Sequence, residues 1–566
     1  MGRTGCMAAL GAAVAAAGLA AASSVGAGGA VYINASVGVA PVGGPAVVPP
    51  VFDTLIFWDY SVFTDAAPDG TAAAYPFLSS VELFTATGGC YIGYPGCTSN
   101  RDCFMNPADP ASGYDYQPLI DALDEVRESG FTPYVVTGMI PIALSAAPAL
   151  GAFGFNTAPA SNWSAYGDYI TNFALQSAAR FGPDVVAGWR WGVLTEFNNP
   201  DWYVNDTNQY FDLYDWTVCA LQGVLGPNIT VGAHACTQCT VAGGGSGWDP
   251  LALLNHTRYG TNACTGGVGT RITFLTDSFY ERTPGTPGDL SWYAPQVGAL
   301  RAGAIALGYG DLTFGIDEGR ILAGTDGLPL LTRAVGSAYQ ASFDALLFKL
   351  MVYGGASTYA RWGITSNGGG GLFTWQSDVD PVSTQVARLA HAMAGDALLA
   401  VTNTTAPGTS PGPAAVDATV SVSPAGTLHV LAVRHAPTVN DTTSDAAVVT
   451  VCGLTPGAGT LVGTATPVDE THANFWPAWQ ADAAAAGIDS YQSGWSPQCE
   501  QVALTNATQA AYFASRVPAY RALAALTPYP LVATLSPAGC ATFSLAMVGH
   551  AVVLATFDGA VAAAAE

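Results

Sequence analysis

The chain has 566 residues, enough for one large domain and a smaller second one. It carries 41 acidic and 17 basic residues, and a formal net charge of -24 argues against nucleic acid and anionic membrane surfaces as partners, because both would be repelled. The same charge disfavours a strongly anionic polymer as substrate.

Residues 1–27 have the pattern of a secretory signal peptide. Arg3 precedes a small apolar block, and small residues at 23–27 supply a cleavage region. An N-terminal anchor is the alternative, but alanine and glycine make this block weakly hydrophobic and short for a span. Eight Asn-x-Ser/Thr sites independently favour a secretory route, so we expect a secreted, extracellular glycoprotein. These sites begin at Asn34, Asn162, Asn205, Asn228, Asn255, Asn403, Asn440 and Asn506.

Ten cysteines remain once Cys6 in the signal region is set aside, and an even number in an oxidising compartment favours local disulfides. They are Cys90, Cys97, Cys103, Cys219, Cys236, Cys239, Cys264, Cys452, Cys499 and Cys540. A metal site at His234-Ala-Cys236-Thr-Gln-Cys239 is the alternative for that segment, but a single Cys-x-x-Cys is weak evidence for it. We therefore expect neither a metal nor a cofactor.

Between residues 52 and 398, short apolar runs alternate with helical patterns, which is typical of strand–helix units around a parallel sheet. The expected strands are 55–60, 80–84, 133–138, 186–194, 229–233, 271–277, 312–317 and 357–362. The expected helices are 116–130, 163–180, 208–225, 292–307 and 338–353. This order predicts a (β/α)8 barrel. An open doubly wound sheet is the alternative, weakened because no glycine-rich phosphate loop follows the first strand.

The composition and the residue pattern of the sequence change after residue 398. A Pro/Gly/Ser/Thr linker at 405–413 is followed by runs that alternate apolar and polar residues, and these predict an antiparallel β-sandwich over 399–566. The segment 28–51 is expected to add a strand to this sandwich. The loop 468–474 carries polar groups, but a turn or an interdomain contact is its expected use.

Two of the expected barrel strands end in carboxylates. The run 187–194 leads directly to Thr195-Glu196, and the run 311–316 leads to Asp317-Glu318. In such barrels the catalytic side chains lie at the carboxyl ends of several strands. A lone Glu196 is more often a loop residue paired with an arginine, whereas a second strand-end carboxylate favours a catalytic pair.

Several stretches resemble glycoside hydrolase family 39, the β-xylosidase and α-L-iduronidase family. They are 114–145, 189–198, 274–280, 316–319 and 468–476. The resemblance implies a retaining glycosidase in which Glu196 is the acid/base and Glu318 the nucleophile, with their carboxyl groups about 5–6 Å apart. It also implies contacts to an oligo- or polysaccharide substrate from Thr195, Asn198, Tyr280 and Trp362. Trp189, Trp191 and Phe197 could supply apolar surroundings for Glu196, although side chains alternate along a strand and not all three can face it.

Four positions depart from the family pattern. Thr195 stands where the family usually has asparagine, and Phe197 where it usually has proline. Glu82 and Ser278 stand where it usually has arginine and histidine. Two hypotheses follow. The first is a secreted exo-glycosidase of the β-xylosidase kind that acts on neutral plant or algal glycans, and the alternative is a catalytically weakened barrel that binds carbohydrate.

Overall fold

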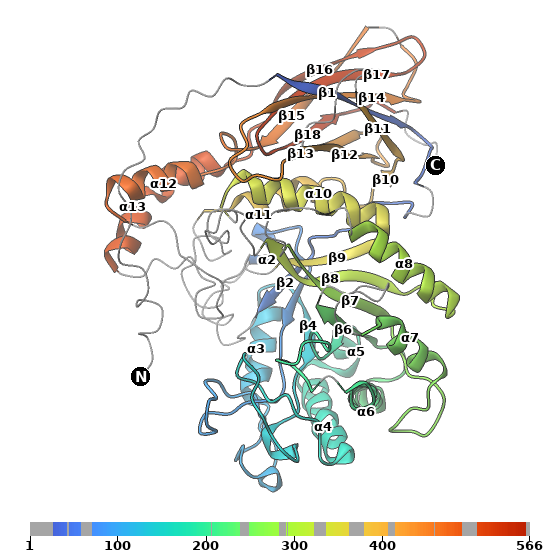
Figure 1. The fold of residues 1–566 in the computed structure, drawn as a ribbon, viewed down its shortest axis with the longest axis vertical. Helices are drawn as coiled ribbons and strands as arrows, with labels where there is room; N and C mark the ends of the chain where they lie inside the picture. Colours follow the sequence, from blue (N-terminus) through green and yellow to red (C-terminus); the bar gives the residue numbers. More distant parts are fainter. Residues whose placement is uncertain are drawn as a thin grey trace.

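The molecule consists of an eight-stranded barrel and a ten-stranded curled sheet, with helices around the barrel and to one side (Figure 1). The structure is a computed structural model that describes residues 27–41, 45–57, 71–204, 206–237, 248–281, 290, 293–321, 336–361, 379–405, 414–457, 459–488 and 507–561. The expected signal peptide therefore lies almost entirely outside the described residues. Within them, no helix is both long and apolar enough to cross a bilayer.

The barrel is closed by eight parallel strands, each paired with the next in chain order and the last paired with the first. They are β2 (Thr54–Phe57), β3 (Ser80–Leu83), β4 (Thr132–Thr137), β5 (Arg190–Val193), β6 (Thr230–Thr237), β7 (Phe274–Glu281), β8 (Thr313–Ile321) and β9 (Ala356–Arg361). The predicted (β/α)8 barrel is confirmed, and the open sheet is wrong.

Helices alternate with these strands and cover the outside of the barrel. They are α2 (Thr71–Ala74), α3 (Gln117–Glu128), α4 (Trp163–Phe181), α5 (Pro183–Ala187), α6 (Thr207–Leu225), α7 (Pro250–Tyr259), α8 (Tyr293–Ala306), α10 (Ala338–Gly354) and α11 (Val382–His391). Side-chain oxygens of Asn162, Asp206 and Asp249 accept backbone N–H groups at the starts of α4, α6 and α7. These caps explain why the three helices begin where they do.

The fourth barrel strand is shorter than the sequence predicts. The apolar run from 186 onward looks like one strand, but Pro183 starts a short helix, α5, that includes Val186. Proline at the first position favours a helix because its fixed φ suits the helical turn and it lacks an N–H group. The chain then enters β5 at Arg190, so the predicted strand start was wrong by four residues.

The ten-stranded sheet contains β1 (Ala27–Ser36), β10 (Ala397–Leu398), β11 (Val401–Thr405), β12 (Ala415–Val422), β13 (Leu428–His435), β14 (Ser444–Cys452), β15 (Gly459–Val468), β16 (Tyr529–Leu535), β17 (Ala541–Val548) and β18 (Ala551–Phe557). Their order is β10-β12-β13-β18-β15-β16-β17-β14-β1-β11. The sheet encloses its own apolar core. It is mixed rather than purely antiparallel, because β1 runs parallel to β14.

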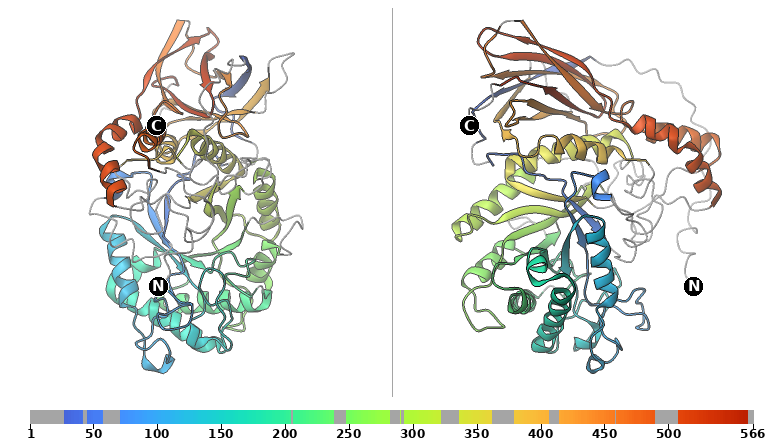
Figure 2. Two further views of the ribbon diagram at one scale, coloured as in Figure 1. Left: turned by 60° about the vertical axis from the view of Figure 1, so that its left-hand side comes forward. Right: turned by 180° about the vertical axis from the view of Figure 1, so that it is seen from behind.

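Two helices that the sequence analysis did not anticipate belong to the segment between β15 and β16. They are α12 (Trp476–Ala485) and α13 (Ala507–Ala524). The rings of Trp479, Phe513 and Tyr520 pack together in a small separate core. Figure 2 shows the pair standing to one side of the molecule, away from the strands of the curled sheet.

Three disulfides hold described parts of the chain together: Cys90–Cys97, Cys219–Cys264 and Cys452–Cys540. The prediction of local disulfides is confirmed for these six cysteines. Cys103, which lies close to the first pair in the sequence, is instead a buried free thiol. Burial raises its pKa to about 12, so the thiol stays protonated. The side chains of Cys236, Cys239 and Cys499 lie outside the described residues.

Helix α10 joins the barrel to the curled sheet, lying between the two in Figure 1. Its Ser342 hydroxyl meets Nδ1 of His435 at 2.7 Å and Nδ1 of His550 at 3.2 Å. The ring of Tyr339 stacks on His435 and meets His550 edge-on. At the start of the helix, the backbone N–H of Ala338 donates to a carboxylate oxygen of Glu470 from the loop after β15. The interface is therefore built from polar groups as well as apolar ones.

Candidate active site

Glu196 lies just beyond the carboxyl end of β5, the fourth barrel strand, in a strained backbone segment. Its φ is 43°, and that of Leu194 is 60°. Positive φ is costly for residues with a side chain, so the surrounding structure must hold them there. The side chain of Glu196 is buried, with 3% of the residue exposed. Such strain is concentrated at functional sites, which makes this turn a candidate for one.

Two N–H donors from the following loop hold the Glu196 carboxyl group. Its Oε2 accepts from the Asn199 amide at 2.9 Å and from the Trp202 indole at 3.1 Å. Trp202 is itself fixed by Phe153, whose ring stacks on it with centroids 4.3 Å apart. The sequence analysis assigned no role to Asn199 or Trp202. The signal was present in the polar and aromatic residues that follow Glu196 before α6.

The aromatic surroundings of Glu196 differ from the expectation. Trp189 packs on Phe181 of helix α4, and Trp191 packs on Phe173 of the same helix, so both lie on the outer, helix-facing side of the barrel wall. Alternation along a strand sends Arg190 between them to the inside. Neither tryptophan therefore supplies the apolar surroundings of Glu196, and the alternation of side chains that limits which aromatics can face it accounts for this.

Phe197, the neighbour of Glu196 in sequence, packs among other rings. It stacks on Tyr210 of α6 with centroids 4.2 Å apart and meets Trp248 edge-on at 4.5 Å. Asn198 follows it in a half-buried turn. Two other predicted substrate contacts cannot be placed among these groups: Tyr280 is on β7 with its side chain outside the described part, and Trp362 lies wholly outside the described residues.

Glu318 is the sixth residue of β8, the seventh barrel strand, and is 9% exposed. Its neighbour Asp317 is fully buried and is held from three sides. Oδ2 of Asp317 accepts from the Tyr134 hydroxyl at 2.6 Å and from Thr276 at 2.5 Å, while Oδ1 lies 3.6 Å from a guanidinium nitrogen of Arg190. Because Tyr134 is on the third strand, its contact with the seventh runs through the barrel interior.

Arg190 is the cation of this interior. Its guanidinium carbon lies 4.4 Å from the ring centroid of Tyr134 and 3.9 Å from that of Phe274, an arrangement suited to cation–π attraction. A further nitrogen lies 3.4 Å from the hydroxyl of Thr358 on the last strand. Gly192, two residues on, leaves room for the Tyr134 ring, since a Cβ there would approach Tyr134 and Val136 within 3.0–3.2 Å.

Glu82, one of the departures from the family pattern, points into the same interior. It is fully buried, and neither of its carboxyl oxygens has a hydrogen-bond partner among the described residues. Burial raises its pKa well above the usual range; the charges of Asp317 and Glu318 add to this and Arg190 opposes it. Burial likewise raises the pKa of Asp53 to about 6 against the opposing charge of Arg190. Burial therefore favours the neutral form of Glu82, close to the predicted nucleophile.

The other two departures, Thr195 and Ser278, meet through one histidine. Nδ1 of His234 lies 2.9 Å from the Thr195 hydroxyl, and its Nε2 lies 2.8 Å from the Ser278 hydroxyl. All three residues are fully buried. Burial lowers the pKa of His234 although Asp317 and Glu196 act to raise it, so the ring is neutral. The ring atoms of His234 thus make hydrogen bonds in the segment where the sequence left a metal site as an alternative.

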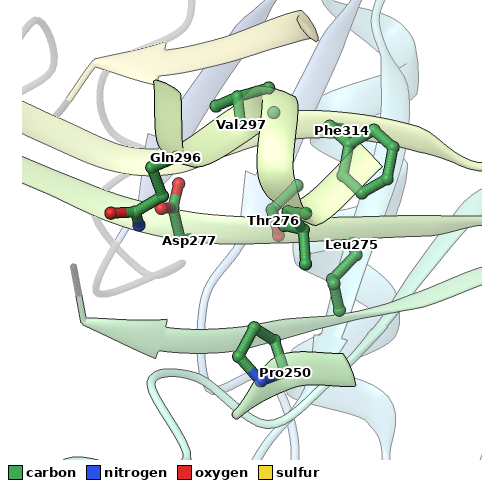
Figure 3. A pocket seen from close by; sticks show the side chains of 9 residues that line it. Pro250, Leu275, Thr276, Asp277, Gln296, Val297 and Phe314 are labelled. Atoms are coloured by element: carbon green, nitrogen blue, oxygen red, sulfur yellow. The ribbon is translucent and has the colours of Figure 1, made fainter. Parts of the chain in front are cut away.

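A cavity elsewhere in the barrel lies outside this site. It is lined from β7, β8 and the starts of α7 and α8, between the strand wall and the helices (Figure 3). Asp277 and Gln296 point toward each other there and are hydrogen-bonded. Burial raises the pKa of Asp277 to about 8 despite that bond. Because Asp277 faces outward while Thr276 and Ser278 face inward, this cavity belongs to the packing of the barrel wall.

Comparisons with known proteins agree with this architecture. The sequence model of glycosyl hydrolases family 39 matches residues 100–281. Among curated protein sequences, none matches the chain significantly. The solved structure of a bacterial orthologue of human α-L-iduronidase is similar over 94% of this chain and 84% of its own, with 16% identity and a TM-score of 0.62.

Two further solved structures are similar to the same extent. A monomeric β-xylosidase from Caulobacter crescentus is covered over 99% of its length and 93% of this chain, with 15% identity and a TM-score of 0.61. The family 39 enzyme from Xanthomonas axonopodis pv. citri is covered over 97% of its length and 93% of this chain, with 14% identity and a TM-score of 0.61. At these identities the structural likeness establishes the fold.

The closed barrel and the match to the family model together define the class of this protein, which is a glycosidase acting on a carbohydrate. Its similarity to glycosyl hydrolases family 39 is found over residues 100–281, and the similar solved structures share its fold.

Proposed function

We propose that this protein is a secreted exo-glycosidase that cleaves neutral glycosides, β-xylosides first among them, with Glu196 as acid/base and Glu318 as nucleophile. The observation that carries the proposal is the placement of the two glutamates after the fourth strand and in the seventh strand of one closed parallel barrel. Parallel strands present their carboxyl ends at one edge, where barrel enzymes carry their catalytic groups. The similar structure from Caulobacter crescentus is that of a β-xylosidase, which supports the substrate class.

The reaction proceeds by two displacements. In the first, the Glu318 carboxylate attacks the anomeric carbon while Glu196 donates its proton to the departing oxygen, so the glycosidic bond breaks and a glycosyl ester forms. In the second, Glu196 removes a proton from water, the water oxygen attacks the same carbon, and the ester bond to Glu318 breaks. Asn199 and Trp202 serve both steps by fixing the orientation of the Glu196 carboxyl group.

The second candidate is a carbohydrate-binding barrel with weakened catalysis. One observation favours it: the Thr195 hydroxyl is fully buried and already engaged by His234, so it reaches a sugar poorly. Turnover of aryl glycosides separates the two candidates, because a binding protein has affinity for the sugar without releasing the aryl group.

The test is a pair of unequal substitutions assayed on aryl glycosides. Glu318→Ala should lower kcat by at least about 10⁴-fold on every substrate, because no glycosyl-enzyme forms. Glu196→Ala should be milder on substrates with good leaving groups, and azide should partly restore its activity. Glu470→Ala, a glutamate at the domain interface, is the matched control and should turn over normally. If both site variants keep the wild-type rate, the proposed function is wrong.

A further inference from the structure

The hydrogen-bonded chain Thr195–His234–Ser278 links the two halves of the candidate active site. Thr195 immediately precedes Glu196, and Ser278 is the register partner of Glu318 on the neighbouring strand. The pairing skips Asp317 at a register shift, which allows Asp317 and Glu318 both to face the barrel interior. Paired residues on adjacent parallel strands face the same side of the sheet, so Ser278 faces the interior together with Glu318. One imidazole therefore holds hydroxyl groups next to each of the two glutamates.

This hydrogen-bonded trio is closed to solvent, since Thr195, His234 and Ser278 are each 0% exposed. A neutral imidazole carries a proton on only one of its two ring nitrogens. His234 must therefore donate one of these two hydrogen bonds and accept the other. In whichever contact the ring donates, the hydroxyl keeps its own proton free for another acceptor. The tautomer of His234 thus decides which of the two hydroxyl groups is available as a donor.

The surroundings favour Nε2–H. With this tautomer the Thr195 hydroxyl donates to Nδ1, Nε2 donates to Ser278, and the Ser278 proton is free to point toward its neighbour Glu318. Glu196 already accepts two N–H donors from Asn199 and Trp202. A hydroxyl donated to a carboxylate forms a charge-assisted bond, which is stronger than one between neutral groups.

We propose that His234 is a positioning residue for both catalytic glutamates: as a neutral Nε2–H imidazole it holds Thr195 against the Glu196 turn and directs the Ser278 hydroxyl toward Glu318. The inference rests on the proposed function and deepens it. It assigns no contact between His234 and the substrate, because the ring is fully buried. Its role is to hold the two ends of the site in register.

Three substitutions separate the two contacts. In His234→Asn the side-chain amide lies near the position of Nδ1 and keeps the hydrogen bond to Thr195. In His234→Gln the amide lies near the position of Nε2 and keeps the hydrogen bond to Ser278. His234→Leu fills the volume and keeps neither bond. His234→Leu should lower kcat about 10- to 100-fold with little change in KM, the cost of a misplaced catalytic group. His234→Asn should be slow on all aryl glycosides, because the nucleophile side is affected. His234→Gln should be slow chiefly on poor leaving groups, because the acid side is affected.

The matched control is His256, a histidine that is hydrogen-bonded to Asp215 in the helical layer outside the barrel. The same three substitutions there should change the melting temperature without any dependence on the leaving group. If the wild-type enzyme turns over and His234→Leu matches its kcat, the inference is wrong while the proposed function stands. If the three His234 variants lose activity equally on all leaving groups, the role is structural and the inference is also wrong.

Nitrogen NMR of the wild-type protein tests the tautomer directly, with the His234 signal assigned by its absence from His234→Leu. We expect a neutral ring with its proton on Nε2. A proton on Nδ1, or a charged ring at neutral pH, would overturn the proposal. A wild-type protein that fails to cleave any aryl glycoside would instead remove the proposed function, and this inference with it.

Discussion

Two arginines of this protein, the buried Arg434 in the curled sheet and the half-buried Arg190 in the barrel, are accommodated in opposite ways. Arg434 is 1% exposed, and all three guanidinium nitrogens are hydrogen-bonded, to Asp441, Asp445, Thr443 and the Gly549 carbonyl. Although burial raises the pKa of Asp441, the bonds from Arg434 and Thr443 bring it below its usual range. The cluster around Arg434 is a satisfied ion pair that holds β13 to the following loop.

Arg190 has poorer bonds and more acids around it. Its ion pair with Asp317 is 3.6 Å long, and its Nε has no hydrogen-bond partner among the described residues. Much of its environment is the faces of two aromatic rings. The nearby acids Asp53 and Glu82 have raised pKa values in spite of its charge. One cation thus supports an interior with more carboxyl groups than it neutralises.

The difference distinguishes an arginine that stabilises the fold from one that belongs to the candidate active site. Burying a charge is costly unless it is paired and hydrogen-bonded, so a fully bonded arginine serves stability. A partly buried charge left with incomplete bonds, such as Arg190, is tolerated where function requires it, next to groups whose protonation must be controlled. The Arg190 cluster adjoins Glu318, whereas the Arg434 cluster lies in the sheet domain. Substitutions at the two arginines should therefore have different consequences.

The largest effect on stability is expected from Arg434→Met. Removing this side chain leaves Asp441 and Asp445 without their cation and should lower the free energy of unfolding by about 3–5 kcal/mol. Turnover per folded molecule should stay at the wild-type level. Urea unfolding and an aryl glycoside assay on the same preparation measure the two quantities. A loss of turnover in the folded fraction would contradict the scaffold role.

Acid should lower the free energy of unfolding, through the interface between α10 and the sheet, by an amount similar to that expected for Arg434→Met. His550 is neutral and buried: burial lowers its pKa to about 4, with Arg434 also lowering it and Asp441 and the Thr438 carbonyl opposing. Above pH 6.5 the His550 ring is neutral in both the folded and the unfolded state, so it does not change stability with pH there. Below that pH the unfolded chain gains a proton that the folded chain does not bind, so stability falls between about pH 6.5 and 4, by roughly 3 kcal/mol.

Two substitutions test this dependence. His550→Gln removes the titrating group and should flatten the acid side of the stability curve. His472→Gln alters an exposed histidine paired with Asp469 and should leave the curve as in the wild type. Melting temperatures measured from pH 4 to 7 give the comparison. The buried His435 on the same interface, whose pKa burial lowers well below its usual range, contributes in the same direction. An unchanged curve in His550→Gln would contradict the assignment.

Arg190→Met should affect catalysis rather than mainly stability. Without this cation the negative charge of Asp317 is less compensated, which makes a second negative charge on the neighbouring Glu318 less favourable. We expect kcat to fall about 10- to 100-fold, equivalent to about 1.4–2.7 kcal/mol. The acidic limb of the kcat/KM profile should move to higher pH, because the carboxylate form of the nucleophile is needed. An unshifted limb would mean that Arg190 acts only in packing.

Sequence patterns were sufficient for the barrel because most of its strands and helices have a local pattern of their own. The 3.6-residue spacing of α3 and the apolar run of β4 predict these elements nearly at their observed bounds, and the run of β8 predicts where that strand starts but ends four residues too early. Where an apolar run contains both a helix and a strand, as in α5 and β5, periodicity does not separate them. Helices α12 and α13 were missed because alternating runs on both sides suggested strands throughout that region.

The candidate site was harder to predict from the sequence because the side chains that contact one another there come from different strands. Glu196 and Glu318 were predicted from strand ends, and their catalytic roles stay predictions. The contacts of Asp317 with Tyr134 and Arg190 span the barrel, so no local pattern indicates them. His234 looked like part of a Cys-x-x-Cys segment, and only the closure of β5, β6 and β7 places it between Thr195 and Ser278.

The smallest effect is expected at Glu470, in the loop by which the sheet domain contacts the start of α10. Its Oε1 accepts the backbone N–H of Ala338, the first residue of α10, at 3.2 Å. This contact acts as a helix cap supplied from a distant loop, and the carboxylate also suits the positive end of the helix. Glu470→Ala should lower stability by about 0.5–1 kcal/mol, and Glu470→Gln by less, because the amide keeps an acceptor. Both should retain wild-type kcat, and a fall in turnover in either folded variant would show that this contact reaches the chemistry.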